Sequence, residues 1–434
     1  MNAPDRLTDP GHERAPGRPN TPLRLVDEDH DVPSRLHAEL RARLGLGDRD
    51  GAIDFALRLR THLNAPAQHV DGARAARLFL TLASEGLMYE GSLRALTDLN
   101  RAAGRAASVG ERELEARALE RIAVIHAAQG RLREARLVLA ALVPKLPDPD
   151  GNAFTAAARA LIAVEGLDRG AEELISSSAL DDIPDPYWPL VLLGRARWQL
   201  ARGGEAAALE TAMVARTSRR IRPTSLAAST LLAIRADALS AMGDPATAAM
   251  SLHDPSEHIT PELELARARA EIYLGSSLRA LGVIRRLAAS EDAGPSVRAE
   301  AMLLGLNPEQ QHSAAFARTQ RAVRALVEME GIRRVMTAAP QDVAPVVWPN
   351  ASVDVELRSV QAQPRRLRAS EQRVLQALAN DGGMTEVAER LRISKNTLKT
   401  HAQSIYRKLG VASRRDAVAQ AYLRGLLDPA ADGS

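Results

Sequence analysis

The chain has 434 residues, of which 45% are hydrophobic and only 3% are aromatic, and its formal net charge is +3. A chain of this length is expected to hold about three domains with buried cores, so an intrinsically disordered protein is excluded. The absence of cysteine excludes disulfides, thiolate nucleophiles and cysteine-ligated metal centres. Ala and Leu dominate, and this composition predicts an all-α fold whose helices pack through small side chains.

Residues 1–31 are rich in Pro, Asp and Arg and are predicted to form a disordered tail. They lack the apolar core of a signal peptide, and no apolar run approaches the roughly 20 residues that a membrane helix needs. We therefore expect a cytoplasmic protein with no membrane partner. The acidic run DEDHD at 27–31 is more typical of a solvated linker than of a metal site, so no metal is predicted.

Residues 32–340 are predicted to form helical hairpins that make up a sensor or interaction domain. In LERIAVIHAAQGRLREARLVLAALVPKLP, one periodic helix ends at Gly130 and a second begins within two residues of it. Alanines lie seven residues before and five residues after this glycine, where two crossing helices leave room only for small side chains. The same spacing recurs around Gly203, Gly243 and Gly275, and its second half around Gly166. The alanines are Ala123, Ala135, Ala171, Ala196, Ala208, Ala236, Ala248, Ala268 and Ala280.

These hairpins resemble tetratricopeptide units, whose period is about 34 residues. The resemblance implies a superhelix with a concave face that holds a protein or a small-molecule effector. Large rings concentrate only at Tyr187, Trp188 and Trp198. A ligand cage is one interpretation of these rings, but filling the core is the more usual role of such residues. No cofactor or ligand site is predicted there.

Prolines accumulate from Pro340 to Pro364, which predicts a linker over residues 341–366. A small helical domain is then expected over 367–427, followed by a tail at 428–434. In its basic segment, SKNTLKTHAQSIYRKLG, a helix is predicted over Lys395–Leu409 with Ser394 as its N-cap. One face of this helix carries the apolar stripe Leu398, Ala402, Ile405 and Leu409, and the other carries short polar donors mixed with cations. Such a face suits DNA base edges and phosphates.

A shorter helix ends just before this one, at the sharp turn Arg392–Ser394, which is the order of a helix-turn-helix. The stretch EVAERLRISKNTLKTHAQSIYRKLGVASRRDAVAQAYLRGLL, together with the helix that precedes it, resembles the LuxR-type helix-turn-helix domain. Sigma factors share the first part of this pattern, but they normally lack the ordered segment after the basic helix. The resemblance implies a four-helix domain that binds double-stranded DNA as a homodimer.

The resemblance also implies roles for individual residues. Glu371 and Glu386 match acidic positions that orient the helices. The chain departs from the family at Arg368, where a Thr cap is usual, and at 381–384, where Gly-Leu-Ser-Asn is usual. The implied base contacts are Lys399, Thr400 and Gln403; the backbone contacts are Lys395, Asn396, Thr397, Arg407 and Lys408; the dimer contacts are Val418, Ala421 and Tyr422. Burial in the domain's own core is an equally good interpretation of the last three.

Charge separates the C-terminal domain from the rest of the chain. Residues 365–427 hold thirteen Lys and Arg against five Asp and Glu, a net of +8, which leaves −5 for the remainder. This asymmetry favours a DNA-binding transcriptional regulator, with binding that weakens steeply with salt. A protein-interaction scaffold is the main alternative. A nucleotide-hydrolysing regulator is a weaker one: the repeats and C-terminal domain resemble those of MalT-like regulators, but the chain has no Gly-Lys pair for a phosphate-binding loop. No catalytic motif is found, and we predict neither an enzyme nor a cofactor.

Overall fold

The computed structural model describes residues 32–65, 70–149, 151–219, 221–222, 225–252, 260–274, 277–349, 367, 369–380, 382–409, 411, 413–423 and 427. Within these ranges the regular structure is helical and no strand occurs, which confirms the predicted all-α class. None of the helices described is both long and apolar enough to cross a bilayer. The predicted disordered tail at 1–31 and C-terminal tail at 428–434 lie outside the described residues.

The chain divides after Gln68 into two compact units, a boundary that the sequence did not predict. The first unit contains α1 (Val32–Leu46) and α2 (Arg49–Asn64), which pack as a hairpin around the left-handed Gly47. Asp48 caps α2 because its carboxylate accepts a hydrogen bond from the Gly51 amide.

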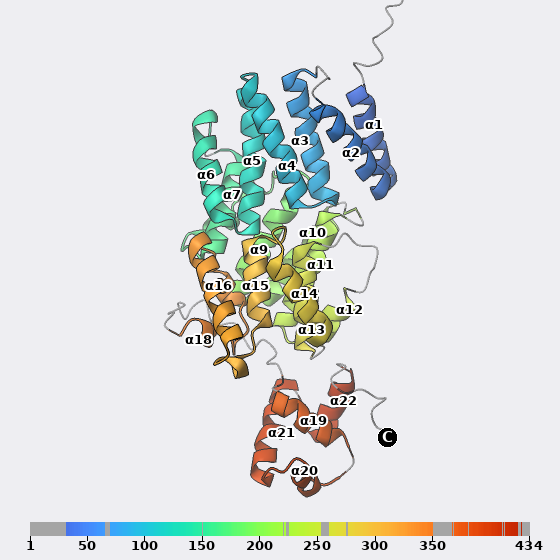
Figure 1. The fold of residues 1–434 in the computed structure, drawn as a ribbon, viewed down its shortest axis with the longest axis vertical. Helices are drawn as coiled ribbons and strands as arrows, with labels where there is room; N and C mark the ends of the chain where they lie inside the picture. The colour runs from blue at the N-terminus through green and yellow to red at the C-terminus, as the bar shows by residue number, and fades with distance from the viewer. Residues whose placement is uncertain are drawn as a thin grey trace, which may run out of the picture. The chain divides into compact units, whose positions relative to one another are not determined.

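The second unit begins with a long series of helices (Figure 1). Its first half comprises α3 (Gly72–Tyr89), α4 (Ser92–Ser108), α5 (Arg112–Gln129), α6 (Leu132–Leu142), α7 (Ala153–Gly166), α8 (Ala171–Ile175), α9 (Trp188–Ala201) and α10 (Glu205–Ser218). Its second half comprises α11 (Leu226–Ala241), α12 (Pro245–Met250), α13 (Pro261–Tyr273), α14 (Ser277–Ala289), α15 (Gly294–Gly305), α16 (Ala314–Glu330), α17 (Val335–Ala338) and α18 (Ala344–Val347). We call α3–α18 the helical domain.

The predicted hairpin turns are present at three glycines. Gly130, Gly203 and Gly243 have left-handed φ values of 80°, 74° and 88°, which glycine adopts without steric cost. All nine alanines of the predicted pattern are at most 1% exposed, so small side chains do lie where paired helices meet. Gly275 lies outside the described residues.

The turn predicted at Gly166 is wrong. Gly166 is the last residue of α7, and the left-handed residue is Leu167, with φ 55°. The amide of Leu167 donates to the Val164 carbonyl and that of Asp168 to the Ala163 carbonyl. These bonds satisfy the carbonyls at the end of α7 without a glycine in the left-handed position.

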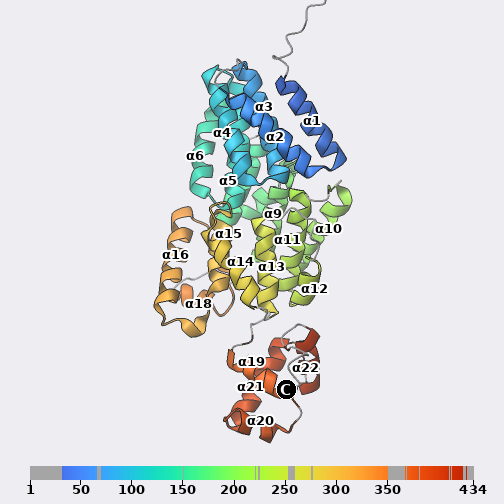
Figure 2. The same ribbon diagram turned by 45° about the vertical axis from the view of Figure 1, so that its right-hand side comes forward.

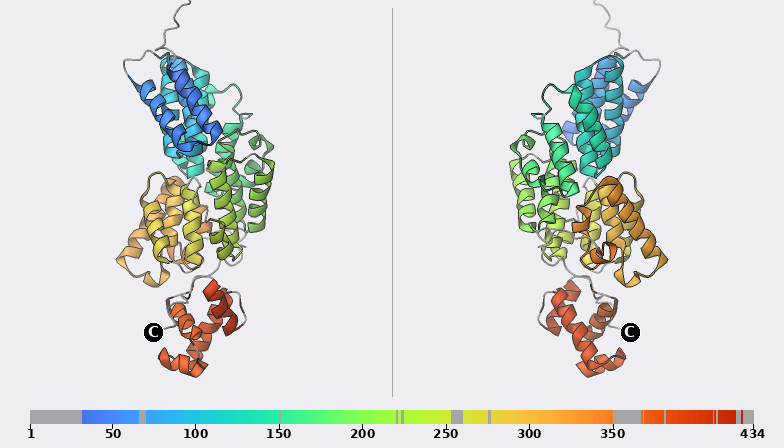
Figure 3. Two further views of the ribbon diagram at one scale, coloured as in Figure 1. Left: turned by 90° about the vertical axis from the view of Figure 1, so that its right-hand side faces the viewer. Right: turned by 90° about the vertical axis from the view of Figure 1, so that its left-hand side faces the viewer.

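The end of the helical domain packs onto its beginning. In a simple solenoid each repeat contacts only its neighbours, but here α15 contacts α5 and α16 contacts α6. The guanidinium of Arg131 donates to the Glu291 carbonyl, and the Arg133 amide donates to the Glu330 carboxylate at 3.3 Å. Figure 2 shows α15 and α16 side by side, and in Figure 3 the yellow and orange helices form a layer beside the green ones. Helices α15 and α16 therefore cover part of the earlier helices of the same domain.

Glycine permits this close packing. Gly294 has φ 68°, and a Cβ placed on it would lie 2.8 Å from the Gln129 carbonyl oxygen. A Cβ on Gly130 would collide with the Ser296 hydroxyl. Both contacts join the carboxyl end of α5 to the amino end of α15, so this junction excludes larger residues.

The helical domain extends beyond its predicted end at Pro340. Val343 and Val347 are fully buried; Val343 directly precedes α18, and Val347 is its last residue. The side chains of Gln320 and Arg324, on α16, donate to the carbonyls of Val346 and Val347. The start of the predicted linker at 341 is therefore wrong, because the chain packs on the domain to residue 348 at least. Residues 350–366 of that linker lie outside the described residues.

The aromatic cluster belongs to the main hydrophobic core. Tyr187 is 1% exposed, and Trp188 and Trp198 are each 5% exposed. The ring of Tyr187 meets that of Phe154 edge to face, with centroids 5.4 Å apart. The core interpretation of these rings is confirmed.

Candidate DNA-binding surface

Four helices with a core of their own form the C-terminal domain. They are α19 (Ala369–Ala379), α20 (Met384–Arg390), α21 (Lys395–Leu409) and α22 (Arg414–Leu423). Their shared core contains Val374, Leu375, Leu378, Val387, Ala388, Leu398, Ala402, Ile405, Leu409, Ala417, Ala421 and Leu427. This set includes the entire apolar stripe that the sequence assigned to the basic helix.

A tight turn joins α20 to α21. Arg392 takes the left-handed conformation, with φ 53°, which is uncommon for a residue with a side chain. The Ile393 amide donates to the Ala388 carbonyl at 3.0 Å, closing the end of α20. α21 then begins at the predicted residue, and the turn holds the two helices as a helix-turn-helix pair.

Ser394 caps α21 as predicted. Its hydroxyl oxygen accepts a hydrogen bond from the Thr397 amide at 3.0 Å, and the hydroxyls of Ser394 and Thr397 are 2.8 Å apart. Both residues are exposed. The amino end of a helix carries partial positive charge and attracts anions, so this end of α21 suits a phosphate.

The face of α21 opposite the core is polar and open. Thr400 keeps its oxygen available as an acceptor, because its hydroxyl donates to the Asn396 carbonyl at 2.9 Å. The side chains of Arg407 and Lys408 lie outside the described residues. The exposed residues of this face are Lys395, Asn396, Thr397, Lys399, Thr400 and Gln403.

Two acidic side chains orient the helices. Glu371, on α19, is 2% exposed and accepts a hydrogen bond from the Ser404 hydroxyl of α21 at 2.7 Å. Glu386 reaches back to accept from the Gly383 amide at 3.1 Å, which satisfies a free donor at the start of α20. These contacts agree with the structural roles that the LuxR resemblance implies.

Sequence reasoning missed the role of Arg414. Its guanidinium donates to the carbonyls of Leu378, Asn380 and Gly382, at 2.9, 2.8 and 2.6 Å. The last carbonyls of a helix have no partner within the helix, and here a cation from α22 supplies one. Arg390 adds a bond to the Ala377 carbonyl. Two of the thirteen cations are thus engaged at the end of α19, where the chain departs from the usual family turn.

The predicted dimer contacts fare unequally. Ala421 is fully buried in the domain's own core, so it is unavailable to a second chain and its prediction is wrong. Val418 is half-buried and packs against the same core. The side chain of Tyr422 lies outside the described residues. Val418 and Tyr422 remain predictions.

A short helix, a left-handed turn and a capped basic helix define a helix-turn-helix domain of the kind that binds DNA. Residues 366–421 match the family model described as bacterial regulatory proteins, luxR family. The C-terminal domain is therefore a LuxR-family domain. Groups of three or more His, Cys, Asp or Glu suited to a metal ion do not occur among the described residues.

The similar proteins are named as regulators. Over 86 residues the chain is 36% identical to the probable transcriptional regulatory protein NarL of Mycobacterium tuberculosis, covering 20% of this chain and 39% of that protein. Over 53 residues it is 47% identical to the probable transcriptional regulatory protein SgaR of Hyphomicrobium methylovorum, covering 12% of this chain and 25% of that protein. The chain thus spans less than half the length of either relative.

Proposed function

We propose that this protein is a cytoplasmic DNA-binding transcriptional regulator. The observation that carries the proposal is the geometry of α21, whose apolar stripe is buried while its polar and cationic face stands open beside a capped amino end. The match of residues 366–421 to the LuxR family supports it. The net charge of +8 in residues 365–427 also supports it, because Lys and Arg side chains bind DNA by neutralising its phosphates.

In this proposal α21 enters the major groove and its residues divide their work. Lys399, Thr400 and Gln403 read base edges, since their side chains offer donors and acceptors from the middle of the open face. The phosphate contacts are Lys395, Asn396, Thr397, Arg407 and Lys408. The protein binds as a homodimer through α22, with Val418 and Tyr422 in the contact, and the helical domain regulates binding.

Selection of DNA from a fragmented genomic pool tests the proposal, with the full-length protein and residues 350–434 used in parallel. Enrichment of the same sites by both supports constitutive binding. Enrichment by the fragment alone supports a helical domain that masks α21 until an effector binds. Enrichment by neither contradicts the proposal and favours the scaffold alternative. An assay of ATP turnover above background is the matching test of the nucleotide-hydrolysing alternative.

A further inference from the structure

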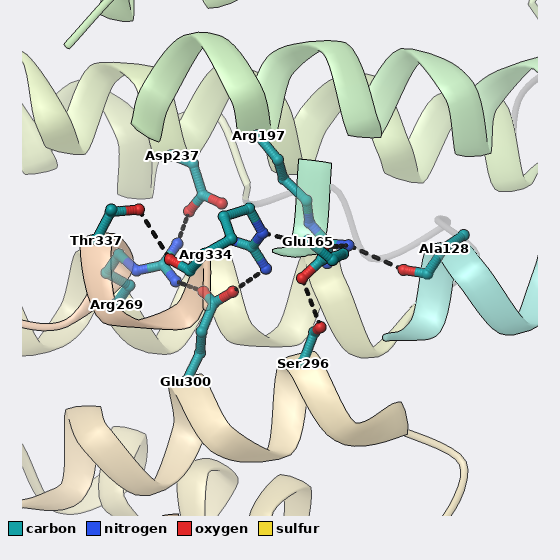
Figure 4. Close-up of polar contacts among 9 residues, drawn as sticks. All are labelled: Ala128, Glu165, Arg197, Asp237, Arg269, Ser296, Glu300, Arg334 and Thr337. Carbon is teal, nitrogen blue, oxygen red and sulfur yellow. Dashed lines mark hydrogen bonds and ion pairs between the residues drawn. The ribbon is translucent and has the colours of Figure 1, made fainter. Parts of the chain in front are cut away.

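Six charged side chains form a continuous chain of alternating sign inside the helical domain (Figure 4). Arg334 stands at its centre: its Nε donates to Glu165 at 2.9 Å, and a terminal nitrogen donates to Glu300 at 2.7 Å. Beyond Glu300 the chain continues through Arg269, and beyond Glu165 through Arg197. The order is Asp237, Arg269, Glu300, Arg334, Glu165 and Arg197. We call these residues the ion-pair chain.

The ion-pair chain is buried and balanced. Arg334 is 4% exposed, Glu300 5% and Glu165 1%. Burial opposes ionisation of Glu300, but Arg334 and Arg269 outweigh it and lower the pKa of Glu300 to about 2. Removing such charges from water is costly, and well-packed apolar residues are often at least as stabilising. Stability alone therefore does not explain why these charges are buried here. The residues around the ion-pair chain suggest another role.

A cavity of about 70 Å³ lies against the ion-pair chain. A single water needs roughly 10–15 Å³ by this measure, so the cavity has space for a small organic group. Five members of the ion-pair chain line one part of the cavity, and apolar side chains such as Leu200, Leu265 and Tyr273 line another. The five are Arg197, Asp237, Arg269, Glu300 and Arg334. The cavity thus offers a charged wall and an apolar wall.

Glu262 adds a carboxylate to this cavity beyond those of the ion-pair chain. It lines the cavity and forms no salt bridge with another described residue, although the charge of Arg197 acts on it. The three arginines of the ion-pair chain are already matched by Asp237, Glu165 and Glu300. Loss of hydration raises the pKa of Glu262 against the opposing charge of Arg197, and it raises the pKa of Asp237 against that of Arg269. The position of Glu262 in the first turn of α13 favours its charged form, because the amino end of a helix carries partial positive charge. That partial charge is not a cation, so Glu262 remains without a salt-bridge partner of its own.

We propose that this cavity binds the cationic head of a small molecule, an ammonium or guanidinium group, between Glu262 and Asp237, with a short apolar stem against Leu265 and Tyr273. The ligand supplies a positive charge to match Glu262, the one carboxylate of the cavity that does not belong to the ion-pair chain. An isolated ammonium compound and a basic side chain of another protein share this chemistry, and the proposal commits to the small molecule.

The site also has a route to the rest of the protein. Thr337 and Ala338, on α17, line the cavity together with Arg334. Helices α17 and α18 are the last elements of the helical domain before residues 350–366, which lead to the C-terminal domain. The inference rests on the proposed function at this point, because the small cation would act as the effector of the proposed regulator.

Calorimetric titration and thermal unfolding of the full-length protein at pH 7 test the binding. The probes are propylamine and propylguanidine, with propionate as an anion of similar size. We expect saturable binding of both cations, with a Kd of about millimolar because so small a ligand gains little energy, and no binding of propionate. Absence of saturable cation binding, or equal binding of propionate, overturns the proposal.

Three variants locate the site. Glu262→Gln is expected to weaken binding of both cations at least tenfold. Glu264→Gln is the matched control, since it makes the same change on α13 at a residue that pairs with Arg286 outside the cavity; it should bind like the unchanged protein. Ala241→Leu fills the cavity without altering charge and should abolish binding, which tests the proposal even if Glu262→Gln fails to fold. Undiminished binding by Ala241→Leu contradicts it.

A final experiment separates the inference from the proposed function. The affinity of the full-length protein for a selected DNA site is measured with and without saturating propylamine. A change of threefold or more that disappears in Glu262→Gln supports the effector role. Cation binding without any change in DNA affinity overturns that role, whereas failure to bind any DNA sequence overturns the proposed function and leaves the titration result standing.

Discussion

Arg334 forms hydrogen bonds with Glu165 through both its side chain and its backbone. The guanidinium Nε donates to the Glu165 carboxylate at 2.9 Å, and the Arg334 amide donates to the Glu165 carbonyl at 2.9 Å. The two residues are 169 positions apart in the sequence. The Ser296 hydroxyl donates a hydrogen bond to the other carboxylate oxygen of Glu165 at 2.8 Å. The carboxyl end of α7 is thereby joined to α15 and to the start of α17.

Removal of Arg334 should destabilise the helical domain strongly. Arg334→Met leaves Glu165 and Glu300 buried with one fewer cation, and breaking a buried pair in this way costs about 3–5 kcal/mol. Urea unfolding followed by circular dichroism measures the loss. Arg333→Met is the matched control, because Arg333 is exposed, and it should change the free energy of unfolding by no more than about 0.5 kcal/mol. Equal effects of the two variants would show that the ion-pair chain is not structural.

Two glycine substitutions should act in opposite directions. Gly294→Ala should destabilise the protein, because the new Cβ meets the Gln129 carbonyl and φ is 68°. Gly282→Ala lies in the exposed middle of α14 with no atom within 4 Å of the new Cβ, and it should stabilise by about 0.5–1 kcal/mol. Thermal unfolding of the full-length protein checks both. A stabilised Gly294→Ala variant would contradict the close packing of α5 and α15.

His126 should make stability fall in mild acid. Burial, helped by Arg131, lowers the pKa of His126 to about 4, and its Nδ1 is buried without a hydrogen-bond partner in the described part of the chain. Between pH 6.5 and 4 the unfolded chain binds a proton that the folded chain does not, so stability is lost as pH falls through this window. The loss attributable to His126 is at most about 3 kcal/mol. His126→Gln should flatten the profile of unfolding free energy between these pH values, and an unchanged slope would refute the assignment.

Arg414 should be needed for stability of the C-terminal domain. Arg414→Met leaves the carbonyls of Leu378, Asn380 and Gly382 without their donor, at a cost of about 1–3 kcal/mol. Thermal unfolding of the 350–434 fragment measures this cost. Arg415→Met removes an exposed neighbouring cation and serves as the control. If both variants melt alike, the three carbonyl contacts contribute nothing to stability.

The open face of α21 should separate sequence preference from general affinity. Lys399→Ala and Gln403→Ala are expected to change which sites are selected, with losses of about 1–3 kcal/mol at particular base pairs. Arg407→Ala should weaken all sequences alike and reduce the salt slope by about 1. Gln376→Ala, at an exposed position of α19, is the control for truncation of a glutamine. Equal losses across all sequences for all three variants would refute the division of roles.

Local patterns in the sequence predicted the local structure well. The stripe at Leu398, Ala402, Ile405 and Leu409 is buried because helical periodicity alone places these residues on one face. Ser394 caps α21 because a serine hydroxyl satisfies a free amide wherever it precedes a helix. The paired alanines are buried for an equally local reason, since crossing helices exclude larger side chains.

Contacts between distant segments were beyond such patterns. Nothing near Arg334 in the sequence indicates Glu165 as its partner, and periodicity does not reveal that α15 and α16 return to α5 and α6. Proline content predicted a linker from residue 341. The segment packs on the domain instead, because burying the apolar side chains of Val343 and Val347 is favourable. Arg414 was counted as one cation among many, because only the fold brings it to the end of α19.

Because Val343, Val347 and Arg334 all follow the last long helix of the helical domain, that domain is completed by its own final segment. During synthesis Glu165 and Arg197 emerge from the ribosome long before Arg334, so the buried carboxylate lacks its second cation until almost the whole domain has been made. A chain ended at Pro340 keeps Arg334 but loses both valines and the carbonyls that Gln320 and Arg324 hold. A fragment that keeps the helical domain intact without the C-terminal domain must therefore end after residue 348.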